Sequence, residues 1–127
     1  RDDDVDLGEL VDRLRSMLVQ GLGAGKQVSS RLEPISLHGE RATALALIFC
    51  ELLGNALEHG GEEVRVELGG ANGRVLLTVA DNGGWDESAR EGTGLSIVRA
   101  LVTEELDGEL LLVADGGLRA EVAFPAA

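Results

Sequence analysis

The sequence is poor in positive charge. It has 11 Lys and Arg residues against 23 Asp and Glu residues, which gives a formal net charge of −12. A protein that binds nucleic acid needs Lys and Arg to displace counterions from phosphates, and anionic membrane surfaces attract basic segments. We therefore expect no nucleic-acid partner and no membrane contact. A nucleotide is still allowed, because backbone N–H groups and a metal ion can hold phosphates inside an acidic protein.

Cysteine and long apolar runs are also scarce. The one cysteine, Cys50, excludes an intramolecular disulfide, which suits a reducing compartment, and we expect a cytoplasmic location. Cys50 lies in an apolar segment, so we expect a buried structural thiol. No apolar run reaches the roughly 20 residues of a membrane span. The start, RDDD, does not resemble a signal peptide, and its abruptness predicts that further domains of a longer protein precede it.

The 127 residues suit one domain, and 44% of them are apolar, which is enough for a packed core. We predict a single domain over 1–127. Apolar residues at helical spacing predict helices at 6–20, 40–59 and 94–106. His38 lies just before the second of these, in what we interpret as a short polar turn at the surface.

Apolar and polar residues alternate in 28–32, 64–68 and 75–81, which predicts three strands. Two further strands, 110–113 and 118–124, are predicted to form a closing hairpin around the turn residues Asp115, Gly116 and Gly117. Pro34, close to the end of the strand 28–32, is typical of an edge strand. The order of elements predicts an α/β fold, a two-layer sandwich in which three helices cover one face of a mixed, mostly antiparallel five-stranded sheet.

Three polar residues interrupt the apolar pattern of the second predicted helix. In the segment ELLGNALEHG, Glu51, Asn55 and His59 are each four residues apart, so one helix face presents all three. A solvated helix face is the simpler interpretation. The functional one is a cation site, since an Asn oxygen can bind Mg²⁺ that shares its coordination with phosphates. A nearby carboxylate can orient or deprotonate an attacking group.

The segment DNGGW, 81–85, follows a predicted strand. Asp-Asn-Gly is a common turn signal, and a plain hairpin turn would explain it. Alternatively, Asp81 accepts hydrogen bonds only, so it can select an exocyclic amine such as the adenine 6-amino group. Glycines such as Gly83 let the backbone approach a flat base closely.

The segment GTGLSIV, 92–98, places Gly92 and Gly94 before an apolar helix. A helix N-terminus presents free N–H groups and partial positive charge, which suit phosphates, although a flexible loop before a helix is the simpler interpretation. The third glycine of a dinucleotide fingerprint and the G-x-x-x-x-G-K-[ST] motif are both missing, which argues against Rossmann and P-loop proteins. Together, the three segments predict a nucleotide site in which Asn55 and Asp81 face a shared cleft.

These segments resemble the sequence boxes of the GHKL, or Bergerat-fold, ATPases, which include histidine kinases, gyrase-type topoisomerases, Hsp90 and MutL-like proteins. ELLGNALEH is similar to the N box, DNGG to the first glycine box and GTGLSIVRALV to the second. GGLRAEVAFP is similar to the last hairpin of histidine kinase catalytic domains. The resemblance covers 7–125. It implies the Bergerat ATP-binding fold and the catalytic domain of a sensor histidine kinase, which transfers the γ-phosphate of ATP to a histidine.

The resemblance also implies a role for each matching residue. Asn55 would coordinate the Mg²⁺ that bridges the ATP phosphates, and Glu51 would act as general base or orienting carboxylate. Asp81 would bind the adenine amine with Gly83 beside the base, and His59 would lie near phosphate. The residues of the second glycine box that would contact the nucleotide are Gly92, Thr93, Gly94 and Leu95.

The sequence departs from the family pattern at three places. Trp85 replaces the last glycine of D-x-G-x-G, where it either covers the base or fills a gap. The segment expected to form the ATP lid, about 84–91, is short. Leu118 stands where a threonine usually supports the adenine-binding Asp, which leaves Asp81 to rely on water.

Neither histidine lies in a pattern typical of a phosphoacceptor. The resemblance therefore implies an acceptor histidine on a dimerisation domain of the same protein, outside this chain, and a response regulator as a further partner. An anti-sigma-factor serine kinase of the same fold is one alternative. A degenerate nucleotide-binding interaction module is another; Trp85 and Leu118 favour it, whereas Glu51, Asn55 and Asp81 oppose it.

Overall fold

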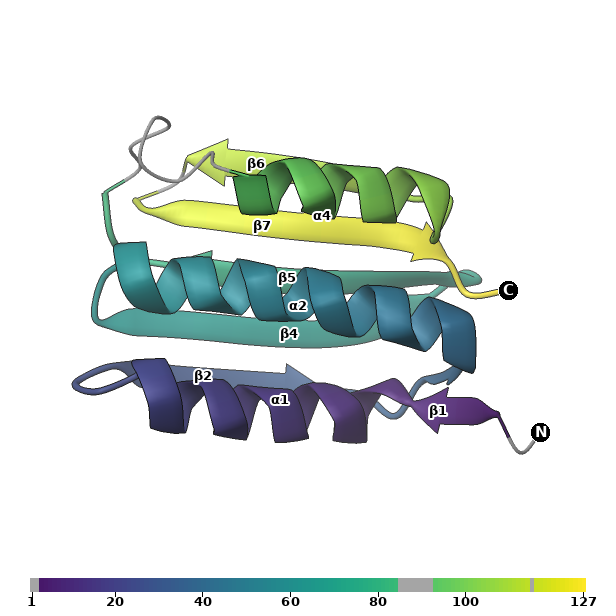
Figure 1. Ribbon diagram of the computed structural model, residues 1–127, viewed down its shortest axis with the longest axis horizontal. Helices are drawn as coiled ribbons and strands as arrows, with labels where there is room; N and C mark the ends of the chain where they lie inside the picture. The colour runs from purple at the N-terminus through teal and green to yellow at the C-terminus, as the bar shows by residue number, and fades with distance from the viewer. Residues whose placement is uncertain (1–2, 85–92, 115) are drawn as a thin grey trace.

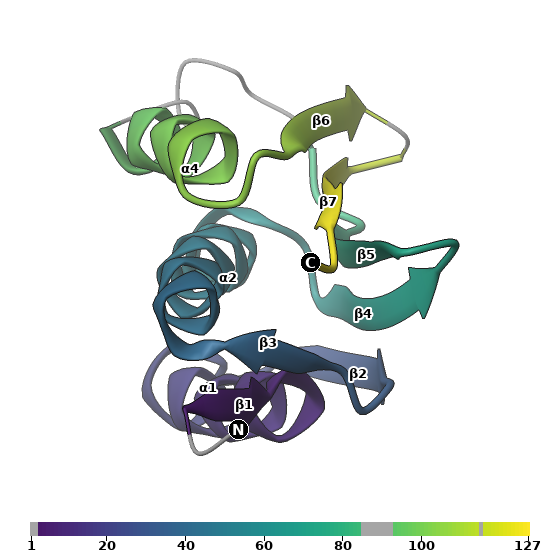
Figure 2. The same ribbon diagram turned by 90° about the vertical axis from the view of Figure 1, so that its right-hand side faces the viewer.

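Helices cover one face of a sheet and leave the other face open (Figure 1, Figure 2). The computed structural model describes residues 3–84, 93–114 and 116–127. Within them, the helices are α1 (Leu7–Leu22), α2 (Gly39–His59) and α4 (Thr93–Glu104), close to the predicted bounds. None of these helices is long and apolar enough to cross a membrane.

The five-stranded sheet has the order β2, β4, β5, β7, β6. Its strands are β2 (Gln27–Leu32), β4 (Glu63–Ala71), β5 (Arg74–Asp81), β6 (Glu109–Ala114) and β7 (Leu118–Pro125). The β2–β4 pair is parallel, and the other three pairs are antiparallel. The predicted two-layer α/β sandwich with a mixed, mostly antiparallel sheet is therefore confirmed, and β2, which precedes Pro34, is an edge strand.

A second, two-stranded sheet was not predicted. β1 (Asp4–Asp6) pairs antiparallel with β3 (Ser36–His38), and each has only three residues, too few for an alternating pattern to be recognised. His38 therefore ends a strand, and the prediction of a polar turn was wrong. Its Nδ1 lies 3.2 Å from Asp3 Oδ2 and 3.9 Å from Asp4 Oδ1, and this contact joins the chain before α1 to the start of α2.

The core lies between the two layers and is largely aliphatic. α2 is its central helix, because it packs against both α1 and α4 and also contacts the sheet. Its fully buried side chains are Leu45, Ile48, Phe49 and Leu53. They meet the helix-facing side chains of the central strands, among them Val66, Leu77, Val122 and Phe124. Each large buried side chain contributes roughly 1.5–3 kcal/mol, so this packing fixes the position of α2.

Arg41 joins the start of α2 to two other elements. Its guanidinium donates hydrogen bonds to the carbonyl oxygens of Leu106, at 3.2 Å, and Pro125, at 2.5 Å. The same group lies 5.6 Å from the centre of the Phe124 ring, within the range of a cation–π contact. The Arg41 side chain thus connects the start of α2 with the segment that follows α4 and with the end of β7.

We expect Arg41→Met to lower the free energy of unfolding by about 1–3 kcal/mol, because two partly buried carbonyls lose a charged donor. Chemical denaturation measures the change. Arg13→Met, at an exposed position on α1, is the matched control and should change stability by less than about 0.5 kcal/mol. Equal effects of the two substitutions would show that the Arg41 contacts do not stabilise the fold.

Candidate functional site

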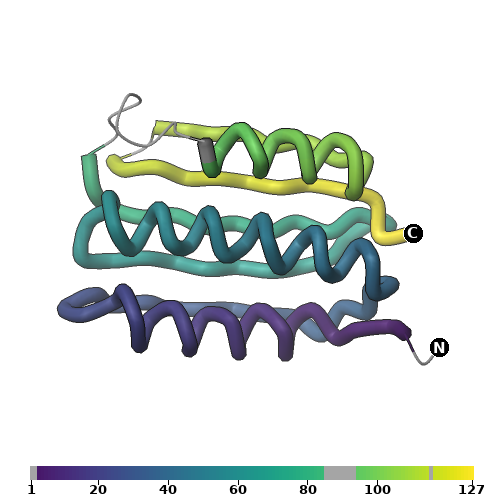
Figure 3. Tube along the Cα trace, viewed as in Figure 1, coloured from purple at the N-terminus to yellow at the C-terminus, as the bar shows by residue number. Residues whose placement is uncertain are grey.

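Three element ends meet at the end of the molecule opposite to both chain termini (Figure 3). They are the C-terminal end of α2, the end of β5 and the start of α4. The three segments predicted to carry the nucleotide site are adjacent to these ends, although they are far apart in the sequence.

A cavity of about 430 Å³ lies between α1, α2 and the start of α4. Its polar wall comes from one face of α2, where Glu51, Asn55 and His59 follow one another at successive turns. Gly94 and Leu95, from the first turn of α4, line the same cavity. The structure therefore brings together five of the residues that the sequence indicated.

Gly94 packs directly against the end of the Glu51 side chain. A Cβ added there would collide with Oε2 of Glu51. The glycine thus lets the first turn of α4 approach the carboxylate of Glu51 directly. The free N–H groups and partial positive charge of a helix N-terminus stabilise a negative group at this place.

Asp81 lies on the helix-facing side at the end of β5, and only 9% of its surface is exposed. Its Oδ1 accepts a hydrogen bond of 2.9 Å from the backbone N–H of Gly83. A Cβ added to Gly60 would lie 2.6 Å from Cγ of Asp81, so the absence of a side chain allows the carboxylate to pack against the residue that follows α2. Gly60 therefore links Asp81 to the helix that carries Asn55.

Two residues that the sequence analysis missed hold this junction. Lys26 Nζ donates hydrogen bonds to the carbonyl oxygens of Gly60, at 3.0 Å, and Gly61, at 2.8 Å. The Asn82 side chain accepts from the backbone N–H of Glu63 at 3.0 Å and donates to its carboxylate at 3.1 Å. Because Lys26 meets partners 34 and 35 positions away, no local pattern could have indicated its role.

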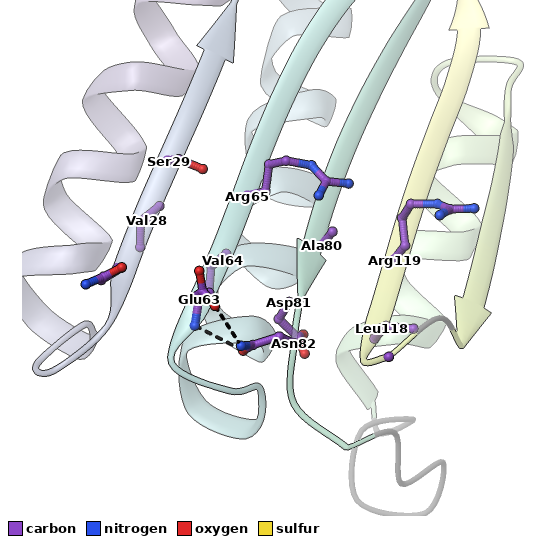
Figure 4. A pocket seen from close by; sticks show the side chains of 12 residues that line it. Val28, Ser29, Glu63, Val64, Arg65, Ala80, Asp81, Asn82, Leu118 and Arg119 are labelled. Carbon is purple, nitrogen blue, oxygen red and sulfur yellow. Dashed lines mark hydrogen bonds between the residues drawn. The ribbon is translucent and has the colours of Figure 1, made fainter.

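Asn55 and Asp81 line separate cavities in the part of the chain that the structure describes, and the shared cleft stays a prediction. Asp81 lines a different cavity, of about 440 Å³, which opens on the far face of the sheet (Figure 4). The reason is that Gly60 and Gly83 cover the carboxylate from the helix side. Trp85, Gly92 and the rest of the predicted lid beyond Gly84 lie outside the described residues, as does the side chain of Thr93.

Leu118 lies beside Asp81 on the neighbouring strand. Ala80 pairs with Arg119 in the antiparallel β5–β7 ladder, which puts Leu118 next to Asp81 on the same face of the sheet. Leu118 is buried, with 5% of its surface exposed. The side chain at this position is therefore apolar and offers no hydroxyl to the carboxylate.

Cys50 is half-buried and lines the α2 cavity, so the expectation of a buried structural thiol was wrong. Burial raises the pKa of its thiol above the ordinary value, and the neighbouring charge of Glu51 raises it further. Both effects disfavour the thiolate, which is the reactive form. The residue is accessible from the cavity, and its raised pKa makes its thiol less reactive at neutral pH than that of a free cysteine.

Residues 40–127 match the protein family described as histidine kinase-, DNA gyrase B-, and HSP90-like ATPase. The chain belongs to this family. The resemblance to GHKL ATPases is thereby confirmed, and the match includes the segments that carry Asn55, Asp81 and Gly94. It also makes the chain homologous to the ATP-binding catalytic domains of sensor histidine kinases.

Two curated relatives are sensor kinases. The chain is 32% identical over 125 residues to the sensor histidine kinase PdtaS of Mycobacterium tuberculosis, covering 86% of this chain and 24% of PdtaS. It is 34% identical over 85 residues to the signal transduction histidine-protein kinase AfsQ2 of Streptomyces coelicolor, covering 64% of this chain and 14% of AfsQ2. The chain thus spans about a quarter, or less, of the length of these relatives.

Solved structures show the same fold. The histidine kinase domain of the Erythrobacter litoralis EL346 blue-light activated histidine kinase matches with a TM-score of 0.87 and 25% identity, over 96% of this chain and 62% of that chain. The mycobacterial sensor histidine kinase MprB matches with a TM-score of 0.80 and 21% identity, over 96% of this chain and 95% of that chain. The second likeness supports the fold alone.

We expect Cys50 to react with iodoacetamide more slowly at pH 7 than a free cysteine does, by roughly tenfold for each unit by which its pKa exceeds the usual value near 8.5. The rate should rise through a midpoint above that value, which mass spectrometry of the adduct measures from pH 7 to pH 10. The urea-unfolded chain is the control, because its only cysteine then titrates normally. A native midpoint at or below the unfolded one would contradict the burial argument.

Proposed function

We propose that the chain is a catalytic module that binds ATP with Mg²⁺ and transfers the γ-phosphoryl group to a histidine. The acceptor would be carried by a dimerisation domain of the same protein, a response regulator would receive the group next, and the setting would be the cytoplasm, where ATP is available. The observation that carries the proposal is the cavity in which Glu51, Asn55 and His59 meet the start of α4. The relatives named above, which are sensor kinases, support the choice of acceptor.

The donor atoms of this cavity fit Mg²⁺. The amide oxygen of Asn55 is a hard oxygen ligand, and Mg²⁺ binds through one or two such protein groups together with substrate phosphates and water. When bound, the ion would neutralise charge on the phosphates and hold them in line for transfer.

The cavity needs this neutralisation because its own positive charge is small. Among the described residues that line it, none is Lys or Arg. The N-terminus of α4 supplies local positive potential, and the imidazole of His59 can donate a hydrogen bond to a phosphate oxygen. Glu51, held beside Gly94, would orient the incoming imidazole and accept its proton.

Asp81 would recognise the adenine amine from the other side of the α2 terminus. Its carboxylate has two acceptor oxygens, and the N–H of Gly83 uses Oδ1. Recognition of the base requires the covering backbone at Gly60 and Gly83 to leave room for it, since Asp81 has only 9% of its surface exposed.

Leu118 favours a second candidate function. An apolar side chain beside Asp81, where the family usually has a threonine, weakens the support of the adenine-binding carboxylate and fits a degenerate module kept for protein contacts. Calorimetry with ATP and Mg²⁺ separates the two functions, because a degenerate module would show no binding at millimolar nucleotide. A serine kinase would instead phosphorylate a Ser-bearing protein and leave a histidine-bearing helical domain unlabelled.

We expect Asn55→Asp to weaken Mg–ATP binding about tenfold, which corresponds to roughly 1.4 kcal/mol. The new carboxylate would lie one turn from Glu51, and the added negative charge would face the triphosphate. Isothermal titration calorimetry measures the change. Asn72→Asp, in the β4–β5 turn at the opposite end of the sheet, is the matched control and should bind as the parent does. If Asn55→Asp binds Mg–ATP as tightly as the parent does, Asn55 does not hold the metal ion.

We expect Asp81→Ala to reduce the preference for ATP over GTP, because the exocyclic amine of adenine loses its acceptor. Competition of each nucleotide against a fluorescent ATP analogue measures this ratio. Thermal unfolding checks that the loss of the Gly83 hydrogen bond leaves the chain folded, and Asp12→Ala, on the exposed side of α1, serves as control. If the ratio stays the same in the folded variant, adenine is not recognised by Asp81.

A further inference from the structure

The sheet face that points away from the helices is covered by no described element (Figure 2). Most of its side chains are polar, but two large apolar residues, Leu76 and Leu111, are 44% and 55% exposed there. An uncovered face with exposed leucines between charged residues is a candidate interaction surface. The strand register shows how its side chains are ordered.

Two neighbouring rows of residues cross this face from β2 to β6. In sheet order, the first row is Ser29, Arg65, Ala80, Arg119 and Val113. The second row, two residues along each strand, is Arg31, Glu67, Thr78, Glu121 and Leu111. Two arginines thus flank a small residue in one row, and two glutamates flank a small residue in the next.

The four central charges balance one another. Arg65 Nε lies 3.5 Å from Glu67 Oε1, and Arg119 Nε lies 3.0 Å from Glu121 Oε2. This part of the face is therefore neutral, although the chain as a whole carries a formal charge of −12. Two copies can bring these faces together without the repulsion that other parts of their surfaces would produce.

We propose that a second copy of this chain docks on this face, related to the first by a twofold axis that runs between the two rows and parallel to them. Such an axis reverses the strand direction and exchanges the rows, while each strand stays opposite its own copy. Every first-row residue then faces the second-row residue of the same strand. Arg65 faces Glu67, and Arg119 faces Glu121 of the second copy.

The uncharged positions match as well. Ala80 faces Thr78, so small side chains meet over the central strand β5, and Val113 faces Leu111, so apolar side chains meet over β6. Antiparallel sheets that pack face to face with nearly aligned strands are a common arrangement. Only the pair on β2, Ser29 with Arg31, adds no complementary charge.

The face is also hollowed along both rows. Figure 4 shows Ser29, Arg65 and Arg119 around the cavity of about 440 Å³ in the first row. A second cavity, of about 430 Å³, includes Glu67, Thr78 and Leu76. Because small residues form the floor of each cavity, long side chains of a second copy can enter them. The cavity lined by Glu51 and Asn55 is on the helix side of the sheet, whereas Asp81 also lines the first of the two cavities on the open face, so the docking is tested without nucleotide.

Sedimentation equilibrium of the chain tests this docking. At about 0.1 M salt, which screens the net charges of the two copies beyond roughly 10 Å, and at concentrations up to about 1 mM, the apparent mass should rise from 13.3 kDa toward twice that value. High salt should weaken the association, since exposed ion pairs are screened. A chain that stays monomeric throughout this range would overturn the proposal.

A charge exchange tests the register. The variant R65E/R119E carries only acidic charges at the four central positions, and E67R/E121R carries only basic ones, so each should self-associate at least tenfold more weakly than the parent. An equimolar mixture should form a heterodimer, because every facing pair is again of opposite sign. R13E/R15E, with the same charge change on α1, should associate as the parent does.

Circular dichroism confirms that each variant is folded before the measurement. If either folded variant self-associates like the parent, or if the mixture contains only monomers, the proposed pairing is wrong. Such results would leave the face for a different occupant, such as another domain or an anionic ligand at Arg65 and Arg119.

Discussion

The burial of α2 determines where every other part of this structure lies. One stripe of the helix packs its aliphatic side chains and Phe49 against the sheet, and α1 and α4 enclose it from both sides. The polar residues Glu51 and Asn55 lie on another part of the same helix, where they line the cavity. Because the helix cannot rotate without exposing its apolar stripe, core packing also fixes the direction of the polar side chains.

The end of α2 is equally constrained. The helix stops at Gly60, and Asp81 occupies the space that a side chain at Gly60 would need. Lys26 holds the carbonyl groups of this junction in place. Asp81, at the end of a strand, can therefore pack against Gly60, at the end of a helix, because Gly60 has no Cβ atom. The groups proposed to recognise the base and to hold the metal ion thus lie on either side of a single helix terminus.

Much of this arrangement could be predicted from the sequence, because it follows from periodicity. Helical spacing located α2 and showed that Glu51, Asn55 and His59 share one face. Alternating patterns located β2, β4 and β5, and the turn at Asp115-Gly116-Gly117 between two apolar segments located β6 and β7. The family boxes added Asp81 and Gly94. These features depend on residues close in the sequence or on motifs with fixed order, so tertiary packing is not needed to recognise them.

Other features depend on long-range contacts and could not be predicted. β1 and β3 are too short to show a pattern, and the contacts of Lys26 depend on how β2 pairs with β4. The sequence also does not show that Gly60 and Gly83 cover the carboxylate of Asp81, so that Asn55 and Asp81 line separate cavities among the described residues. The rows on the open face likewise appear only once the strand register is known.

The most direct test of the central claim is an NMR titration of the isotope-labelled chain with Mg²⁺ and a non-hydrolysable ATP analogue. If one nucleotide binds around the terminus of α2, backbone amide signals of residues 51–59 and 81–83 should shift together and give a single dissociation constant. Shifts confined to one of these segments, or two different dissociation constants, would show that the helix end does not hold both parts of one ligand.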